Sequence, residues 1–312
     1  VAARHPPPQG GRYVTLDARE LDRRTGFIAA ASAYVMWGFL PLYLKLISFA
    51  DVREVLAQRI VWAIPAALIA IAVMSGLRKG AGEITAAFHP RMLATLIASA
   101  AFIFMNWGLY VYLVLHERVI ESSLAYFLSP LVSVAIGVMF FRERITTPQV
   151  VALVLALAGV IVQGFALGAP PWMALALCAT WQAYAVIRKR AQVPAAVGLL
   201  VECLALAPVA VLLLGWASEE APLAFTEGAG RAVLIALAGP GTAIPLVAFT
   251  FGARRVSFTT LGLLQFLAPS LQFATGVAFG EPFTFLRGVS FALIWAGLGF
   301  FAWDALRRAR HG

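Results

Sequence analysis

The chain has 312 residues, of which 61% are hydrophobic and only 12% are charged, whereas an ordinary soluble domain is roughly 25% charged. This composition excludes a soluble globular domain. The formal net charge of +9 does not indicate nucleic-acid binding, because the basic residues lie in short clusters between apolar runs. Cys178 and Cys203 both fall inside apolar runs, so neither a disulfide framework nor a metal site is expected. The sequence has no Walker-type phosphate-binding loop, and no cofactor is expected.

Taken in order, the chain starts with a polar, proline-containing segment over residues 1–25, which is predicted to be a disordered cytoplasmic tail. It has no apolar core of the kind that signal peptides carry. The segments that follow are apolar for roughly 18 to 24 residues each, the length that a helix needs to cross a bilayer. They predict an all-α polytopic membrane protein with ten transmembrane helices, at 26–49, 56–76, 92–115, 120–141, 148–167, 171–188, 195–216, 231–251, 257–280 and 285–304. Residues 305–312 are predicted to form a second cytoplasmic tail.

The basic residues are concentrated in alternate connections between these segments. Examples are Arg78 and Lys79, the run 188–190, and Arg254 and Arg255, all of which share a side with the N-terminal segment if ten spans are present. Lysine and arginine favour the cytoplasmic side of a membrane. The sequence therefore predicts that both the N terminus and the C terminus are cytoplasmic.

One stretch occurs twice. Tyr126-Phe127-Leu128-Ser129-Pro130, which runs on to Glu143, recurs as Gln265-Phe266-Leu267-Ala268-Pro269, which runs on to Glu281. An internal period of this length indicates a duplicated unit, here predicted as five-helix repeats over 26–167 and 171–304. An odd number of spans makes the two repeats cross the membrane in opposite senses, a design typical of secondary transporters. Further pairs keep the same order, among them Trp37 with Trp181, Arg59 with Glu202, and Tyr110 with Phe249.

Other motifs follow one another along the chain, namely Asn106-Trp107-Gly108, Phe140-Phe141-Arg142-Glu143-Arg144, Gly241-Thr242-Ala243-Ile244-Pro245-Leu246 and Gly280-Glu281-Pro282-Phe283-Thr284. Together with the repeated stretch, they resemble the RarD group of EamA-type transporters, in the drug/metabolite transporter superfamily. The likeness covers nearly all of residues 26–304. It implies a carrier of the bacterial inner membrane with ten helices in two EamA repeats. Members of the group are commonly labelled chloramphenicol-sensitivity or chloramphenicol-resistance permeases, and relatives in the superfamily carry amino acids and other small metabolites.

The expected function is that of a secondary transporter, not an enzyme, that exports or exchanges a small amphipathic metabolite or drug by alternating access. Its expected partners are the small-molecule substrate and the lipid bilayer. The alternatives are a membrane-embedded enzyme and a non-transporting scaffold. An enzyme would need a nucleophile with a base, or a cluster of acids and histidines, at membrane depth.

Two charged residues inside the apolar segments are candidates for coupling or charge recognition. Glu202 is the only carboxylate well inside such a segment, and a charge at the bilayer centre costs at least ~2.5 kcal/mol. It is expected to face a polar cavity or a partner, for proton coupling or for recognition of a cation, with a helix-packing hydrogen bond as the alternative. Arg59, its match in the first repeat, is expected to pair locally with Glu54 or Asp51 or to extend to the outer interface.

Polar and aromatic side chains near prolines predict a substrate cavity at mid-depth. Proline frees a backbone carbonyl in a helix, and within a membrane that carbonyl needs another partner. The alternative is a set of structural kinks held by hydrogen bonds between helices, with Lys45 extending to the interface. Glu143 and Glu281 are predicted to be structural residues at helix ends, with a gate as the alternative. The predicted cavity residues are Trp37, Lys45, Asn106, Tyr110, Tyr126, Pro130, Phe249, Gln265, Pro269 and Gln272.

Overall fold

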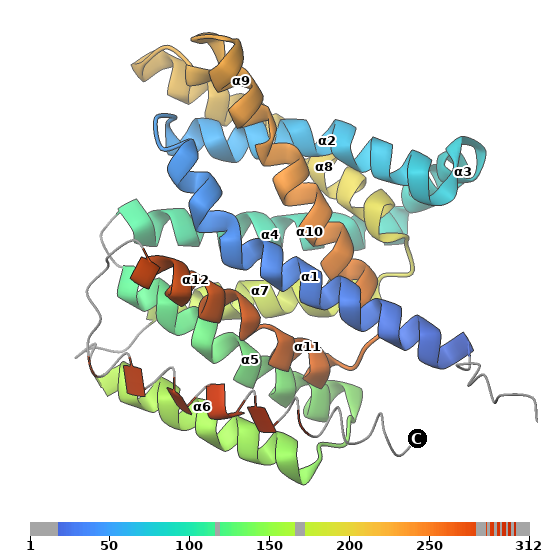
Figure 1. Ribbon diagram of the computed structural model, residues 1–312. Coiled ribbons are helices and arrows are strands. Elements are labelled where there is room, and N and C mark those ends of the chain that lie inside the picture. Colours follow the sequence, from blue (N-terminus) through green and yellow to red (C-terminus); the bar gives the residue numbers. More distant parts are fainter. Residues whose placement is uncertain are drawn as a thin grey trace, which may run out of the picture.

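The computed structural model describes residues 18–115, 119–165 and 172–278, with scattered positions between 285 and 303. All regular structure in these residues is helical (Figure 1). Residues 18–25, assigned to the N-terminal tail above, form the first turns of a helix, while 1–17 and 305–312 lie outside the described residues. The helices are α1 (Ala18–Leu46), α2 (Val52–Ser75), α3 (Leu77–Ala87), α4 (Pro90–Leu115), α5 (Val119–Phe141), α6 (Thr147–Phe165), α7 (Trp172–Arg190), α8 (Ala195–Glu220), the 3-10 turn η1 (Ala224–Thr226), α9 (Ala229–Ala236), α10 (Ala238–Ala253), α11 (Phe258–Leu264) and α12 (Leu267–Ala278).

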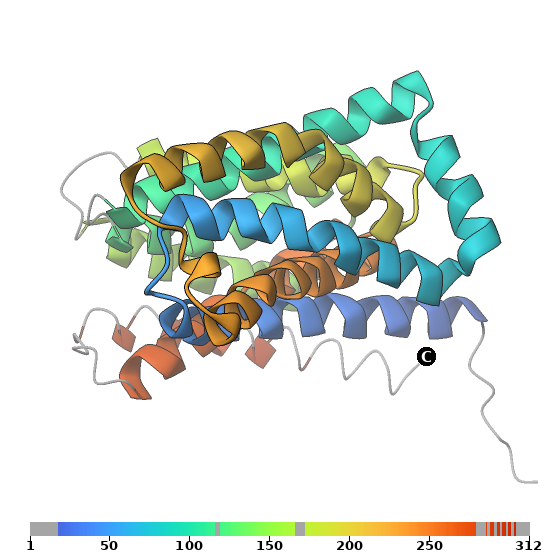
Figure 2. The same cartoon turned by 90° about the horizontal axis from the view of Figure 1, so that it is seen from above.

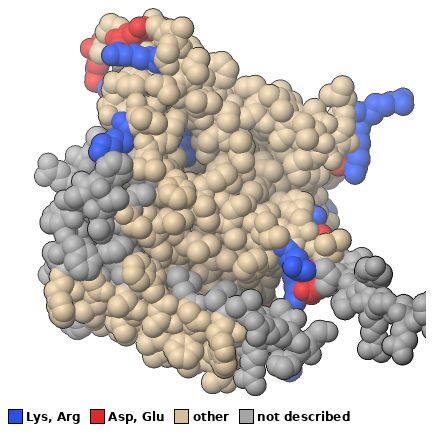
Figure 3. All heavy atoms as spheres, viewed as in Figure 1, with Lys and Arg blue, Asp and Glu red and all other residues tan. Residues whose placement is uncertain are grey.

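The protein is an all-helical polytopic membrane protein. Within the described residues, five stretches are long and apolar enough to cross a bilayer, namely Glu20–Leu46, Val52–Ser75, Pro90–Tyr110, Ala195–Glu220 and Ala229–Ala253. Their outer faces carry exposed aliphatic side chains, such as Val73 (80% exposed) and Leu212 (73%). On the face shown in Figure 3, charged side chains gather near the ends of the helices and leave an apolar belt between them. This distribution is the one that a lipid environment favours.

The helices pack in corresponding pairs. α2 lies along α8, and α5 crosses α11. α1 contacts α10 and α12, much as α7 contacts α4 and α5, and α10 contacts α2 as α4 contacts α8. Small residues allow these close contacts. A Cβ on Gly252 of α10 would lie 2.6 Å from the carbonyl oxygen of Gly26 in α1, and one on Gly239 would lie 2.2 Å from the backbone of Trp62 in α2.

The structure differs from the predicted elements in three further places. The connection after the second segment forms a helix of its own, α3, which Figures 1 and 2 place at the opposite end of the bundle from α9. The eighth segment is divided at Leu237 into α9 and α10, and the ninth is divided at Gln265 and Phe266 into α11 and α12. Both breaks stand just before a proline, Pro240 or Pro269. Proline cannot donate the next hydrogen bond of a continuing helix, yet it suits the first turn of a new one.

Candidate functional site

A cavity of about 140 Å³ lies where α1, α2, α4, α5, α7 and α10 meet the turn between α11 and α12. Its walls are mainly aromatic and aliphatic. Among the residues predicted from the sequence, it is lined by Trp37, Arg59, Asn106, Tyr110, Tyr126 and Gln265. Sequence reasoning did not assign Trp107, Trp181 and Thr242 to the cavity, although Trp107 and Thr242 stand in two of the quoted motifs and Trp181 is the match of Trp37.

The cavity lies toward one end of the bundle. Leu44 is in the last turn of α1, and Thr242 is in the second turn of α10. At the same end, the hydroxyl of Tyr43 donates a hydrogen bond of 2.9 Å to the carbonyl oxygen of Leu234 in α9. By the predicted orientation, this end faces away from the cytoplasm.

Aromatic rings close the cavity on its deeper side. The matched residues Trp37 and Trp181 meet edge to face, with ring centroids 5.3 Å apart. Phe249 lies within 5.8 Å of Trp37 and 5.2 Å of Trp181, and its side chain is fully buried. Phe249 was predicted to line the cavity, but it lies behind the two tryptophans, where it supports them. The deeper wall is therefore formed by two indole rings that pack on the ring of Phe249.

Arg59 reaches the cavity from α2. Its Nε donates a hydrogen bond of 2.9 Å to Oγ1 of Thr242 in α10. Its guanidinium carbon lies 4.6 Å from the centre of the Trp107 ring, within the range of a cation–π contact. One edge and one face of the guanidinium are thus fixed by two other helices, α10 and α4.

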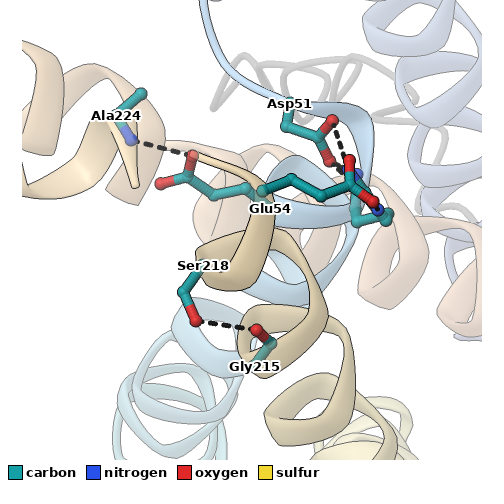
Figure 4. A network of polar contacts seen from close by, with 7 residues as sticks. Asp51, Glu54, Gly215, Ser218 and Ala224 are labelled. Carbon is teal, nitrogen blue, oxygen red and sulfur yellow. Dashed lines mark hydrogen bonds and ion pairs between the residues drawn. The ribbon is translucent and has the colours of Figure 1, made fainter. Parts of the chain in front are cut away.

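The partners predicted for Arg59 are engaged elsewhere. The carboxylate of Glu54 accepts hydrogen bonds from the backbone N–H groups of Ala224 (3.0 Å) and Phe225 (2.8 Å), as Figure 4 shows for Ala224. Asp51 accepts from the backbone N–H and the side chain of Arg53. The proposed local pairing of Arg59 is therefore wrong. The physical reason is that η1 presents unpaired N–H groups, which a nearby carboxylate satisfies.

A polar network joins the cavity to the crossing of α5, α7 and α11. Nε2 of Gln265 donates to Oγ of Ser133 at 2.6 Å, and Ser133 donates to Oε1 of Gln182 at 2.9 Å. Nε2 of Gln182 in turn donates to the carbonyl oxygen of Ser129 at 2.7 Å. Pro130 is buried beside this network and does not line the cavity. The network fixes the amide of Gln265 at the cavity wall.

Asn106 has a contact role as well as a lining role. Its Nδ2 donates to the carbonyl oxygen of Leu177 at 2.8 Å and to Oγ1 of Thr180 at 3.2 Å, both in α7. The amide donor is therefore used between helices, and none of the residues that the structure describes donates to the amide oxygen.

Glu202 does not line the cavity. It is buried against Nη1 of Arg188 at 3.5 Å, and Oγ of Ser99 donates to its Oε1 at 2.6 Å. Sequence analysis placed Arg188 in a cytoplasmic basic cluster, whereas its side chain is 1% exposed. An arginine late in α7 reaches back into the bundle because a buried carboxylate needs a counter-charge.

The remaining predicted residues lie away from the cavity or beyond the described part. Lys45 is exposed in the last turn of α1, and Pro269 is buried in α12, so neither lines the cavity. Gln272 belongs to α12, but its side chain lies outside the described residues, as does the whole of Glu281.

Glu143 is held at a helix end. Arg142 follows α5 in the left-handed conformation, with a φ of 54°, which reverses the chain. The Glu143 carboxylate then accepts hydrogen bonds from the backbone N–H groups of Phe258 (2.6 Å) and Thr259 (2.8 Å). An acid from one half of the chain thereby caps the first turn of α11 in the other half.

Comparison with known proteins places this architecture in a family. The chain is 39% identical to Protein RarD of Streptomyces exfoliatus over 293 residues, which cover 93% of this chain and 92% of that protein. The chain belongs to the RarD group of EamA-like transporters. The model of the EamA-like transporter family matches residues 24–164. Protein RarD of Escherichia coli (strain K12) is 34% identical over 297 residues, covering 95% of this chain and 99% of the relative.

One more relative and one solved structure are also similar to the chain. The Chloramphenicol-sensitive protein RarD of Pseudomonas aeruginosa is 31% identical over 287 residues, covering 91% of this chain and 96% of that protein. A solved structure titled only "Crystal structure of protein" superposes with a TM-score of 0.66 at 23% identity, covering 89% of this chain and 97% of that one. It supports the fold alone. The protein is thus a multi-pass membrane transporter of the RarD type.

Proposed function

We propose that this RarD-type protein is a secondary transporter that exports or exchanges a small amphipathic metabolite or drug across the bacterial inner membrane. The observation that carries the proposal is the aromatic cavity, which is built from helices of both predicted repeats and lies inside the bundle rather than on its surface. Cavities between helices of this kind are where bundles hold small ligands. The substrate would enter from the end near Leu44 and stack on Trp37 and Trp181.

Alternating access of two inverted five-helix repeats is the proposed mechanism. The helix pairs support it, since exchanging the repeats converts the α1–α10 contact into α4–α7 and the α1–α12 contact into α5–α7. The indole pair of Trp37 and Trp181 would then lie on the symmetry axis. The ends of the bundle differ in the way that one state of such a transporter requires: the cavity lies near one end, and Glu143 ties α11 at the other.

Counterflow in proteoliposomes tests this function. Purified protein is reconstituted, and vesicles loaded with bacterial metabolite extract are challenged with labelled chloramphenicol and with labelled aromatic metabolites, with and without a proton gradient. We expect at least one small amphipathic compound to accumulate above the level of protein-free vesicles. The variant Trp181→Ala should reduce this accumulation, and Trp172→Ala, which alters an exposed tryptophan on the same helix, should not. A folded protein that exchanges no compound would instead favour the enzyme or scaffold alternatives.

A further inference from the structure

One charged side chain, that of Arg59, lies among the described residues that line the cavity. The other polar lining groups are the neutral side chains of tyrosine, tryptophan, serine, threonine, asparagine and glutamine. A cation removed from bulk water is costly unless an anion or several acceptors surround it. The lining residues that the structure describes supply Arg59 with one such acceptor, Thr242.

The acids closest along the chain are committed to other groups. Both oxygens of Glu54 accept hydrogen bonds from backbone N–H groups of η1, those of Ala224 and Phe225, and Asp51 is engaged by Arg53. Glu202, the match of Arg59, is paired with Arg188. Among the described residues, no carboxylate contacts Arg59, and its Nη1 and Nη2 donate no hydrogen bond. These two groups form the part of arginine that binds planar oxyanions through two parallel bonds.

The cavity around this cation suits an aromatic ring. Its volume of about 140 Å³ is close to the roughly 150 Å³ of an apolar protein cavity that holds benzene. Trp37 and Trp181 offer ring faces and edges on the deeper side. Tyr110 and Tyr126 meet with centroids 6.1 Å apart and line the same space. Their hydroxyls donate to no residue that the structure describes, which leaves them available to a ligand.

We infer that the cavity selects a small aromatic monoanion, whose carboxylate or sulfonate is held by Nη1 and Nη2 of Arg59 while its ring packs against Trp37 and Trp181. Thr242 and Trp107 orient the guanidinium from its Nε edge and its face. This inference rests on the proposed transport function and narrows its substrate class. It assigns to Arg59 the recognition of substrate charge.

Binding of three probes of nearly equal size tests the charge requirement without relying on transport. Benzoate, benzamide and benzylamine are titrated separately against the full-length protein in detergent, and the unfolding temperature is followed by tryptophan emission. Ligands that bind the folded state raise this temperature in proportion to the logarithm of their concentration. We expect benzoate to bind at least about tenfold more tightly than benzamide or benzylamine, since a charge-assisted bidentate pair is replaced by weaker bonds or by repulsion. Equal or weaker binding of benzoate would overturn the inference.

Variants at position 59 tie this preference to Arg59. In Arg59→Gln, benzoate and benzamide should bind equally. Arg59→Lys should keep a reduced preference for benzoate, because lysine retains the positive charge but lacks the two parallel N–H donors of the guanidinium. The control is Arg53→Gln on the same helix, whose guanidinium is already engaged by Asp51 and Glu220 outside the cavity. It should retain the full preference. An unchanged preference in Arg59→Gln would overturn the assignment, and the three-probe comparison on the wild-type protein holds even if that variant does not fold.

Counterflow separates this inference from the proposed function. Benzenesulfonate is used here, since it does not cross the bilayer as a neutral acid. Exchange of benzenesulfonate supports both proposals. Exchange of neutral or cationic aromatics in its place supports transport and overturns the anion site. Tight benzoate binding without exchange of benzenesulfonate supports the anion site and counts against transport.

Discussion

Arg188 and Glu202 form a buried ion pair, with Nη1 of the arginine 3.5 Å from Oε1 of the glutamate and side chains that are 1% and 2% exposed. Arg188 also donates to the carbonyl oxygen of Ala195 at 2.9 Å, and Ser99 donates to Glu202 at 2.6 Å. The pair therefore joins α7 and α8, which are neighbours along the chain, to α4 of the first half.

Removing the charge of Glu202 should destabilise the protein. In Glu202→Gln, Arg188 is left buried without a counter-charge, and breaking such a pair costs ~3–5 kcal/mol. We expect a clear fall in the unfolding temperature in detergent. The double variant Glu202→Gln with Arg188→Met should recover much of the loss, because neither charge then remains. If the double variant is as unstable as the sum of the two single variants, the charges are not coupled.

The same double variant tests whether Glu202 is the coupling acid. Because Glu202 lies outside the cavity lining and is paired with Arg188, we expect transport by the double variant to respond to an imposed proton gradient in the same way as transport by the wild type. Uptake would be measured in proteoliposomes at several imposed gradients. Intact exchange that no longer responds to the gradient would establish Glu202 as the coupling residue.

Asp51 should stabilise α2 in a pH-dependent way. Its side chain caps the helix by accepting from the backbone N–H of Arg53, and the hydrogen bond from the Arg53 side chain, followed by the backbone bond, holds the pKa of the Asp51 carboxyl below its usual value. A lowered pKa in the folded state means that the stabilisation is present above the ordinary value of about 3.9 and is lost as pH falls through the folded pKa.

We therefore expect Asp51→Ala to lose about 1 kcal/mol near neutral pH and Asp51→Asn to lose less, since asparagine keeps the cap. Over unfolding curves from pH 7 down to pH 3, the difference between wild type and Asp51→Ala should narrow, and wild type should approach Asp51→Asn as the carboxyl group becomes protonated. A difference that stays constant over this range would show that the charge of Asp51 contributes nothing.

Gly252 should tolerate no side chain. A Cβ there would lie 2.6 Å from the Gly26 carbonyl oxygen and 2.7 Å from Cβ of Ala30, so α1 and α10 would have to separate. Gly241, on the same helix, faces open space. We expect Gly252→Ala to cost about 1–3 kcal/mol, as overpacking does, and Gly241→Ala to be neutral or slightly stabilising. The unfolding temperatures of the two variants are compared directly. Equal changes in unfolding temperature would show that α1 and α10 do not pack closely at Gly252.

Thiol labelling in intact cells tests the predicted orientation. Lys79 lies in α3, and Ser218 lies in the last turn of α8, which leads into η1 and α9. Figure 1 places α3 and α9 at opposite ends of the bundle, and both positions are exposed. Because basic clusters favour the cytoplasm, an impermeant maleimide should label Ser218→Cys in spheroplasts and Lys79→Cys only after the membrane is opened. The native Cys178 and Cys203 are buried and provide a low background. The reverse pattern would invert the orientation.

The sequence predicted the fold class and most helix positions because apolar length and composition alone determine which segments enter a membrane. It did not predict α3, whose residues Leu77–Ala87 include two glycines and four charged or hydroxyl side chains, so that no long apolar run is present. That helix is stabilised by tertiary contacts, such as that of Gly80 with Ile71. The division of the ninth segment at Gln265 was foreseeable from Pro269, which was taken as a kink within one helix.

At the site, sequence reasoning named six of the residues that line the cavity, but it assigned partners from local spacing. Arg59 and Thr242 are far apart in the chain, as are Glu54 and Ala224, and only the packing of α2 against α10 and η1 brings each pair together. The Arg188–Glu202 pair was not predicted for another reason. Arg188 belongs to a cluster of basic residues, which is typical of a solvent-exposed helix end. Pairings of this kind depend on how each helix is rotated about its own axis, and the composition of the sequence does not specify this rotation.

The cap that Glu143 places on α11 has a kinetic consequence. It joins the two halves through a pair of charge-assisted hydrogen bonds to backbone N–H groups, beside an apolar contact in which the rings of Phe141 and Phe258 stack with centroids 5.4 Å apart. Under the proposed alternating access, separation of the halves at this end would break bonds to a charged group that are worth about 1.5–3 kcal/mol each, and it would expose both rings to water. We therefore expect the dwell time of the closed end to shorten in Glu143→Ala and, to a smaller extent, in Glu143→Gln, which keeps one acceptor oxygen but loses the charge, as single-molecule distance measurements across this end would show. The time for which this end stays closed would then depend on the polar cap and on the ring contact together.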